Sequence, residues 1–352
     1  MADLPPADRP AMPARRLEGL DALRGIAALC VFQFHASFIL GGATPEASGA
    51  GYLAVDFFFM LSGYVMARTY EQRLAKGFGA MRFLGARYRR LWPIMAIGGV
   101  ITAPMLAMDL GDPATFAAIF VANLLFIPVF FTGTITFPLN SVAWSILAEL
   151  FANAVHAVVL WRWRTRAVFA LAAFCLPALA ATAWYHGTLD LGAGVDNVWA
   201  GLLRALFAYA IGIVLYRKWR DEPPFRLSPL LAFAAMPALF AWSLWVGESS
   251  WLFDVAFVAL VCPLLVGAGL AWQHSHWLAR WLGLLSFPLY AVHLPMLQWG
   301  RGLHVEPVLT MAATIALALY IAWRNEAPKR GKSPRNQPAA AAEPVPTPRG
   351  LA

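Results

Sequence analysis

The stretch ALRGIAALCVFQFHASFIL (residues 22–40) is an apolar run of about the length that an α-helix needs to cross the roughly 30 Å hydrocarbon core of a bilayer. Ten further apolar runs follow, at 51–67, 91–108, 115–131, 142–160, 167–185, 198–216, 228–246, 253–272, 281–299 and 306–323. Of the 352 residues, 60% are hydrophobic and 13% are charged, whereas about 25% of the residues in a soluble domain are charged. The sequence therefore predicts an all-α polytopic membrane protein and excludes the soluble and disordered classes.

The charges between these runs indicate how the chain is threaded. The net charge is +8, but the arginines and lysines gather in alternate segments and the intervening loops carry mainly acids. Because cytoplasmic loops of membrane proteins are rich in lysine and arginine, this pattern predicts a lipid bilayer rather than a nucleic acid as partner. All basic clusters lie on one side of the membrane only if one of the eleven apolar runs does not cross the bilayer. We therefore predict about ten transmembrane helices, a re-entrant or interfacial segment over 115–137, and a bacterial inner-membrane protein with both termini in the cytoplasm.

The composition divides the chain into three parts. Residues 1–16 are predicted to be a cytoplasmic N-terminal segment and 17–323 to be the transmembrane domain. Residues 324–352, rich in proline, alanine, lysine and arginine, predict a disordered basic cytoplasmic tail. Residues 68–90 form a separate, strongly basic segment. The three cysteines lie in apolar runs without metal-ligand spacing, so we expect core residues and no metal site.

Ionisable side chains inside apolar spans are rare and costly, so each is a functional hypothesis. They are His35, Asp56, Glu149, His156, Arg204 and His293. Arg24 and His35 are eleven residues apart, which places them on one helix face and about 16 Å apart along its axis. A guanidinium suits a phosphate or carboxylate because its fork donates paired hydrogen bonds, and a neutral imidazole suits a base or nucleophile. The alternative is an arginine that reaches lipid headgroups and a histidine that packs on a backbone carbonyl.

Two further runs carry polar stripes at spacings i, i+4 and i+7. They are Glu149-Asn153-His156 and Ser286-Tyr290-His293. Such stripes line either a cavity or a helix–helix contact with structural hydrogen bonds. A carboxyl group in mid-membrane needs a partner or a proton, which favours a functional Glu149. The basic run from Arg82 to Pro93 is typical of binding to anionic lipid, or forms a polyphosphate clamp.

Five stretches carry further motif residues in chain order. They are Gly19–Ala28 with His35 downstream, Gly51–Tyr64, Phe83–Pro93, Trp144–Glu149 and Gly283–Pro295. Together they resemble the acyltransferase-3 family of integral membrane O-acyltransferases, here as a stand-alone membrane domain. The departures are Phe287 in place of a tyrosine and Asn140–Ala143 in place of the usual prolines before Trp144.

The resemblance implies transfer of an acyl group, commonly acetyl, from acetyl-CoA as co-substrate to a hydroxyl of a cell-surface or extracellular carbohydrate, with no bound cofactor. The implied acyl-donor-binding residues are Arg24, Arg82, Arg87 and Arg90. His35 is then the general base or an acyl-carrying nucleophile, and Glu149 orients or charge-stabilises an imidazole, a role for which Asp56 competes. The supporting residues are Asp56, Ser62, Trp144, Ser145, Tyr290 and His293. The alternative function is a proton-coupled transporter or flippase of a glycan or lipid precursor, because membrane histidines and carboxylates also form proton relays.

Overall fold

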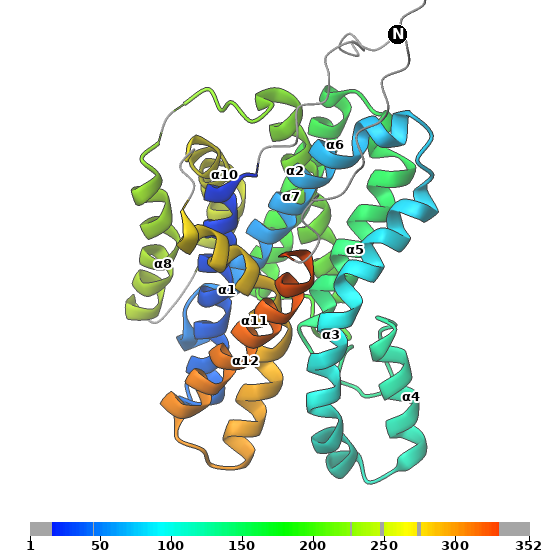
Figure 1. The fold of residues 1–352 in the computed structure, drawn as a ribbon, viewed down its shortest axis with the longest axis vertical. Coiled ribbons are helices and arrows are strands. Elements are labelled where there is room, and N and C mark those ends of the chain that lie inside the picture. The colour runs from blue at the N-terminus through cyan, green and yellow to red at the C-terminus, as the bar shows by residue number, and fades with distance from the viewer. Residues whose placement is uncertain (1–15, 45, 226, 247–249, 273–275, 331–352) are drawn as a thin grey trace, which may run out of the picture.

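The computed structural model describes residues 16–44, 46–225, 227–246, 250–272 and 276–330. These residues form a bundle of helices, most of which run along the long axis of the molecule (Figure 1). The β pairing within them is limited to an isolated antiparallel bridge between Ile135 and Gly194. The predicted all-α class is therefore confirmed.

The helices follow one another with mostly short connections. They are α1 (Glu18–Ile39), α2 (Ala54–Ala75), α3 (Ala80–Leu110), α4 (Pro113–Leu124), α5 (Ala143–Val158), α6 (Thr165–His186), α7 (Val198–Trp219), α8 (Pro229–Val246), α9 (Trp251–Ala256), α10 (Cys262–Ala271), α11 (Trp277–Gly302) and α12 (Pro307–Arg330). A π-helical turn, Phe257–Val261, joins α9 to α10. Short 3₁₀ turns lie at Glu46–Ser48, Gly51–Leu53 and Leu160–Arg162.

Several of these helices can cross a membrane. Six helical segments of the described residues are long and apolar enough to do so: α1, α3, α6, α7, the continuous Trp251–Ala271 segment and α12 up to Glu326. This confirms a multi-pass membrane protein. Helices α2 and α11 are of comparable length, 22 and 26 residues, and pack between the others (Figure 1).

Helix α4 occupies the segment for which the charge pattern predicts no crossing. Its twelve residues rise about 18 Å, too short a distance to span the bilayer core. The Asp112 carboxylate caps its first turn by accepting the backbone N–H groups of Ala114 and Thr115, and the Thr115 hydroxyl and backbone hydrogen bonds hold the pKa of Asp112 below its usual value. Asn123 then holds the irregular return segment through the carbonyls of Ile127 and Thr136.

Two boundaries differ from the sequence predictions. Residues 68–90 do not form a separate segment. Helix α2 continues to Ala75 and α3 starts at Ala80, so the basic residues of this stretch belong mainly to the end of α2 and the start of α3. Helix α12 continues to Arg330, so the first residues of the predicted disordered tail are helical because the helix of the preceding apolar run continues through them. Residues 1–15 and 331–352 lie outside the described residues.

Glycines bring together the helices that form the site. A Cβ on Gly63 of α2 would lie 2.1 Å from the Tyr209 carbonyl oxygen of α7, and one on Gly212 of α7 would lie 2.0 Å from the Met60 oxygen of α2. A Cβ on Gly25 of α1 would likewise lie 2.4 Å from the Cβ of Leu282 on α11. Small residues at such crossings let membrane helices approach closely, and the α1–α11 crossing places His35 beside α11.

Candidate active site

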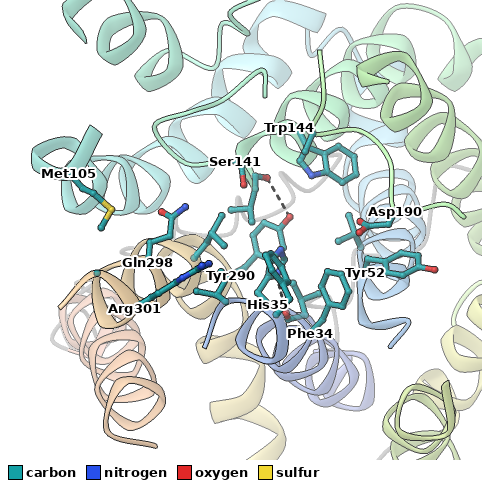
Figure 2. A pocket seen from close by; sticks show the side chains of 18 of the residues that line it. Phe34, His35, Tyr52, Met105, Ser141, Trp144, Asp190, Tyr290, Gln298 and Arg301 are labelled. Carbon is teal, nitrogen blue, oxygen red and sulfur yellow. Dashed lines mark hydrogen bonds between the residues drawn. The ribbon is translucent and has the colours of Figure 1, made fainter. Parts of the chain in front are cut away.

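A cavity of about 810 Å³ lies near the C-terminal ends of α1 and α11 (Figure 2). We call it the His35 cavity. Its walls include Phe34 and His35 of α1, Tyr52 from the turn before α2, Trp144 of α5 and Tyr290 of α11. Aromatic rings with a few polar groups among them suit a ligand that has both apolar faces and hydroxyl groups.

His35 and His293 form a contact that fixes the tautomer of both rings. Nδ1 of His293 lies 3.1 Å and 2.9 Å from the carbonyl oxygens of Leu289 and Tyr290. Because a carbonyl oxygen only accepts, Nδ1 carries the proton and Nε2 of the neutral His293 ring is an acceptor. Nδ1 of His35 lies 3.0 Å from the Val31 carbonyl oxygen and 3.1 Å from that Nε2. It must therefore carry a proton as well.

This arrangement leaves Nε2 of the neutral His35 ring with a lone pair. Nε2 makes no hydrogen bond to another described residue, and the side chain lines the cavity. A proton acceptor or nucleophile needs such an unprotonated nitrogen. The contact joins residues 258 positions apart in the sequence, so helical spacing alone could not predict it.

Tyr290 and Val55 separate the His35 cavity from a second one. Both residues line each cavity. The Tyr290 hydroxyl lies 2.7 Å from the Ser145 hydroxyl, which fixes the ring at this boundary. The second cavity has a volume of about 120 Å³ and is lined by Arg24, among others.

This second cavity, the arginine cavity, takes its character from three cations. They are Arg24 of α1 and Arg87 and Arg90 of α3. The Nε of Arg87 is buried and has no hydrogen-bond partner among the described residues. A buried, unpartnered donor next to further guanidinium groups favours an anionic ligand such as a phosphate.

Glu149 lies in the arginine cavity and contacts no imidazole of the described residues. Arg87 donates from Nη2 to its Oε1 at 2.6 Å, and the Ser62 hydroxyl donates to the same oxygen at 2.7 Å. The predicted role of orienting an imidazole therefore does not fit its position. Glu149 instead holds Arg87, because the α5 face that carries it packs against α2 and α3 rather than α1.

Asp56 is also not a partner of His35. Its carboxylate accepts two hydrogen bonds from Arg204, at 2.6 Å and 3.2 Å, and both residues have no exposed surface. Arg204 also donates to the Leu191 carbonyl oxygen at 2.7 Å, and its guanidinium lies 5.2 Å from the ring centre of Trp144. The pair therefore supports one wall of the His35 cavity.

Arg82 is separated from the other three predicted donor-binding arginines. It lies on an exposed face of α3, where it borders a shallow pocket with Tyr88 and Leu150. At 100° per residue, five positions separate Arg82 from Arg87 by 140° around the helix. The 100° rule that places Arg24 and His35 on one face thus also predicts, from the sequence, that Arg82 and Arg87 lie on different faces.

The Glu149 stripe splits between two surroundings. Asn153 and His156 lie deeper in the bundle, where the Tyr209 hydroxyl donates to Asn153 and lies 2.8 Å from Nδ1 of His156. These contacts match the structural alternative. Asp190, Gln298 and Arg301 also line the His35 cavity and were not among the predicted site residues. Helical spacing could have predicted Gln298 and Arg301, because they follow Tyr290 at i+8 and i+11 and so continue its stripe along the helix.

A multi-pass helical protein with a deprotonated imidazole nitrogen at one cavity and clustered guanidinium groups at the next has the features of a membrane group-transfer enzyme. A family model described as an acyltransferase domain matches residues 17–323. The chain therefore belongs to the acyltransferase-3 family, and it is an acyltransferase.

Three curated proteins illustrate the relationship. Protein 2 in picA locus of Rhizobium radiobacter is 38% identical over 172 residues, which cover 44% of this chain and 86% of that protein. The putative membrane-bound transacylase BcsY of Komagataeibacter xylinus is 24% identical over 345 residues, 88% of this chain and 82% of BcsY. Acyltransferase MdmB of Streptomyces mycarofaciens is 26% identical over 335 residues, 83% and 82% of the two chains. No solved structure matches the chain.

Proposed function

We propose that this membrane acyltransferase moves an acyl group, in the simplest case acetyl, from acyl-CoA to a hydroxyl of a cell-surface or extracellular carbohydrate. The observation that carries the proposal is the pair of cavities that meet at Tyr290 and Val55. One offers guanidinium groups for the donor's phosphates, and the other offers Nε2 of His35 and aromatic walls for a sugar. Residues 17–323 form the catalytic domain on this proposal.

The donor enters from the cytoplasm of a bacterial inner-membrane protein with ten crossings and cytoplasmic termini. The alternation of basic and acidic loops supports this topology. The passes are α1, α2, α3, α5 with its flanking residues, α6, α7, α8, α9–α10, α11 and α12, and α4 is the segment that does not cross. Arg24 then lies toward the cytoplasmic end of α1, and His35 lies toward its external end.

Single-cysteine labelling tests this topology. Arg164 precedes α6 and Asp196 precedes α7, and both are exposed. In a background with the native cysteines replaced by alanine, a membrane-impermeant maleimide added outside spheroplasts should label Asp196→Cys and not Arg164→Cys. After permeabilisation both should react. Labelling of both cysteines from one side of intact membranes would contradict the ten-crossing arrangement.

The chemistry has two forms that use the same nitrogen. With His35 as general base, Nε2 takes the proton of the acceptor hydroxyl while its oxygen attacks the thioester carbonyl. The new C–O bond forms, the C–S bond breaks, and the proton passes to the leaving CoA sulfur. With His35 as nucleophile, Nε2 takes the acyl group and CoA leaves as the thiolate; the acceptor oxygen then displaces the imidazole, and the hydroxyl proton makes up the one that the thiolate takes to become the thiol.

His293 acts as a positioning residue in either form. When Nε2 of His35 gains a proton or an acyl group, the ring becomes cationic and its Nδ1–H becomes a stronger donor. Nε2 of His293 and the Val31 carbonyl oxygen lie where they accept from it. The transport alternative loses its basis, because the family is one of acyltransferases.

A thioester-loss assay tests the proposal. The protein in lipid nanodiscs is given acetyl-CoA with and without oligosaccharides from bacterial surface polysaccharide, and free thiol and acylated product are measured. We expect thiol release that requires both donor and acceptor, with acyl esters detected by mass spectrometry. Absence of any acylated carbohydrate with all acyl-CoA donors would refute the proposal.

Arg90→Ala should raise the KM for acyl-CoA about tenfold or more and leave kcat nearly unchanged. A charge-assisted hydrogen bond to phosphate contributes roughly 1.5–3 kcal/mol, and a contact made equally in ground and transition states affects KM rather than kcat. Arg82→Ala is the matched control, because it removes the same charge from the exposed face of the same helix. Equal effects of the two variants, or a fall in kcat alone, would contradict the assignment.

A further inference from the structure

The external face of the chain carries an isolated cation at the catalytic cavity. Arg301 is in the last turn of α11 and lines the His35 cavity. Its side chain makes no hydrogen bond or ion pair to any other residue that the structure describes. The loops on this side carry mainly acids, so a lone arginine here runs against the charge pattern that sets the topology.

The position of Arg301 relative to the reactive histidine follows from the helix. Tyr290, Leu294, Gln298 and Arg301 line the cavity and form one stripe along α11. Tyr290 and Arg301 are about 16 Å apart along the axis, and long side chains on a helix point toward its N-terminus. The guanidinium of Arg301 is therefore directed back toward the histidine end of the stripe, and Figure 2 shows it beside Gln298 within the cavity.

The opposite wall of the cavity has a different character. Figure 2 shows Asp190 and Tyr52 across from Gln298 and Arg301. A ligand between these walls meets a carboxylate and aromatic rings on one side and donors on the other. Carboxylates and aromatic faces suit neutral hydroxylated rings, and a guanidinium suits a carboxylate or phosphate.

We infer that Arg301 determines acceptor specificity by binding an anionic oxygen group, a carboxylate or a phosphate, on the carbohydrate whose hydroxyl reaches His35. This inference rests on the proposed function. The anionic group lies outward from the acylated hydroxyl, because Arg301 lies outward from Tyr290 along the stripe. The acceptor is then an oligosaccharide rather than a single sugar.

Binding to the protein in nanodiscs tests the inference by calorimetry with three probes. They are a glucuronate-containing oligosaccharide, its carboxyl-reduced counterpart, and the reduced oligosaccharide carrying a phosphate at one end. We expect the wild-type protein to bind at least one anionic probe about tenfold or more tightly than the reduced one. The anionic probe that binds more tightly than the reduced one shows whether Arg301 recognises a carboxylate or a phosphate. Added salt should reduce this difference in affinity.

The variants separate recognition from structure. Arg301→Gln should bring the anionic and reduced probes close to equal affinity without changing the affinity for the reduced probe. Arg301→Lys should keep part of the preference, because it retains the charge but not the planar fork. Arg82→Gln, which removes a charge far from the cavity, should change nothing. Equal binding of all probes by the wild-type protein, or an equal loss for all probes in Arg301→Gln, would overturn the inference.

The outcome also distinguishes this inference from the proposed function. Charge-selective binding that depends on Arg301, without acyl transfer, would reject the proposed reaction and keep the acceptor site. Transfer to the anionic and reduced acceptors with equal KM would keep the reaction and reject the role of Arg301.

Discussion

His35→Gln should lower kcat for acyl transfer by about 10²-fold or more. Glutamine keeps a side-chain hydrogen bond toward the Val31 carbonyl oxygen but has no lone pair that can act as a base or nucleophile at neutral pH. The expected loss follows from the tautomer argument, because Nε2 of His35 is the basic nitrogen that faces the cavity. The measurement is steady-state acetyl transfer in nanodiscs, with folded yield checked by size-exclusion chromatography.

His293→Gln serves as the comparison. It removes the ring that accepts from Nδ1 of His35 but leaves Nε2 of His35 in the cavity. We expect a smaller loss of kcat, together with a shift of the pH–rate profile, because an amide oxygen at this position is a weaker acceptor for the cationic form of His35 than the imidazole nitrogen. If well-folded His35→Gln turns over at a near-normal rate, His35 is structural and the reactive group lies elsewhere.

Asp56→Leu should destabilise the folded protein by about 3–5 kcal/mol, because it leaves the Arg204 guanidinium buried without its counterion. Both side chains have 0% exposure, so neither can turn to water. The fall should be visible as a lower midpoint of thermal unfolding in detergent and a lower yield of folded protein. The Trp144 wall of the His35 cavity should loosen as well, because Arg204 packs on that ring.

A double variant separates the ion pair from general damage at this site. Asp56→Leu with Arg204→Met removes both charges, and replacing a buried ion pair by apolar residues is often neutral. We expect the double variant to be more stable than Asp56→Leu, although the Leu191 carbonyl oxygen loses its donor. Arg280→Gln, which breaks the more exposed pair with Glu326, should change stability by less than about 1 kcal/mol. If the loss of stability in the double variant equals the sum of the losses in Asp56→Leu and Arg204→Met, the two residues are not coupled as an ion pair.

The local pattern of the chain determines the membrane class, most helix positions and the shared face of Arg24 and His35. The physical reason is that helices form from hydrogen bonds between residues four apart, so 100° steps along the sequence carry over to the structure. The prediction that 115–137 does not cross rests instead on the charges of all the loops together, and the helix found there, α4, is short and starts at the Asp112 cap. Family membership likewise comes from the order of short motifs.

Partners across helices were decided by the tertiary structure. The sequence predicts that Glu149 orients an imidazole and that Asp56 competes for this role. In the fold, Glu149 pairs with Arg87 and Asp56 pairs with Arg204. Asp56 and Arg204 are 148 residues apart, and which of several buried cations meets a carboxylate depends on which helix faces pack. That choice is set by the sum of many contacts, including the close approach of α2 and α7 at their glycines, and no spacing along one helix contains it. The same holds for His35 and His293, whose contact exists because α1 crosses α11.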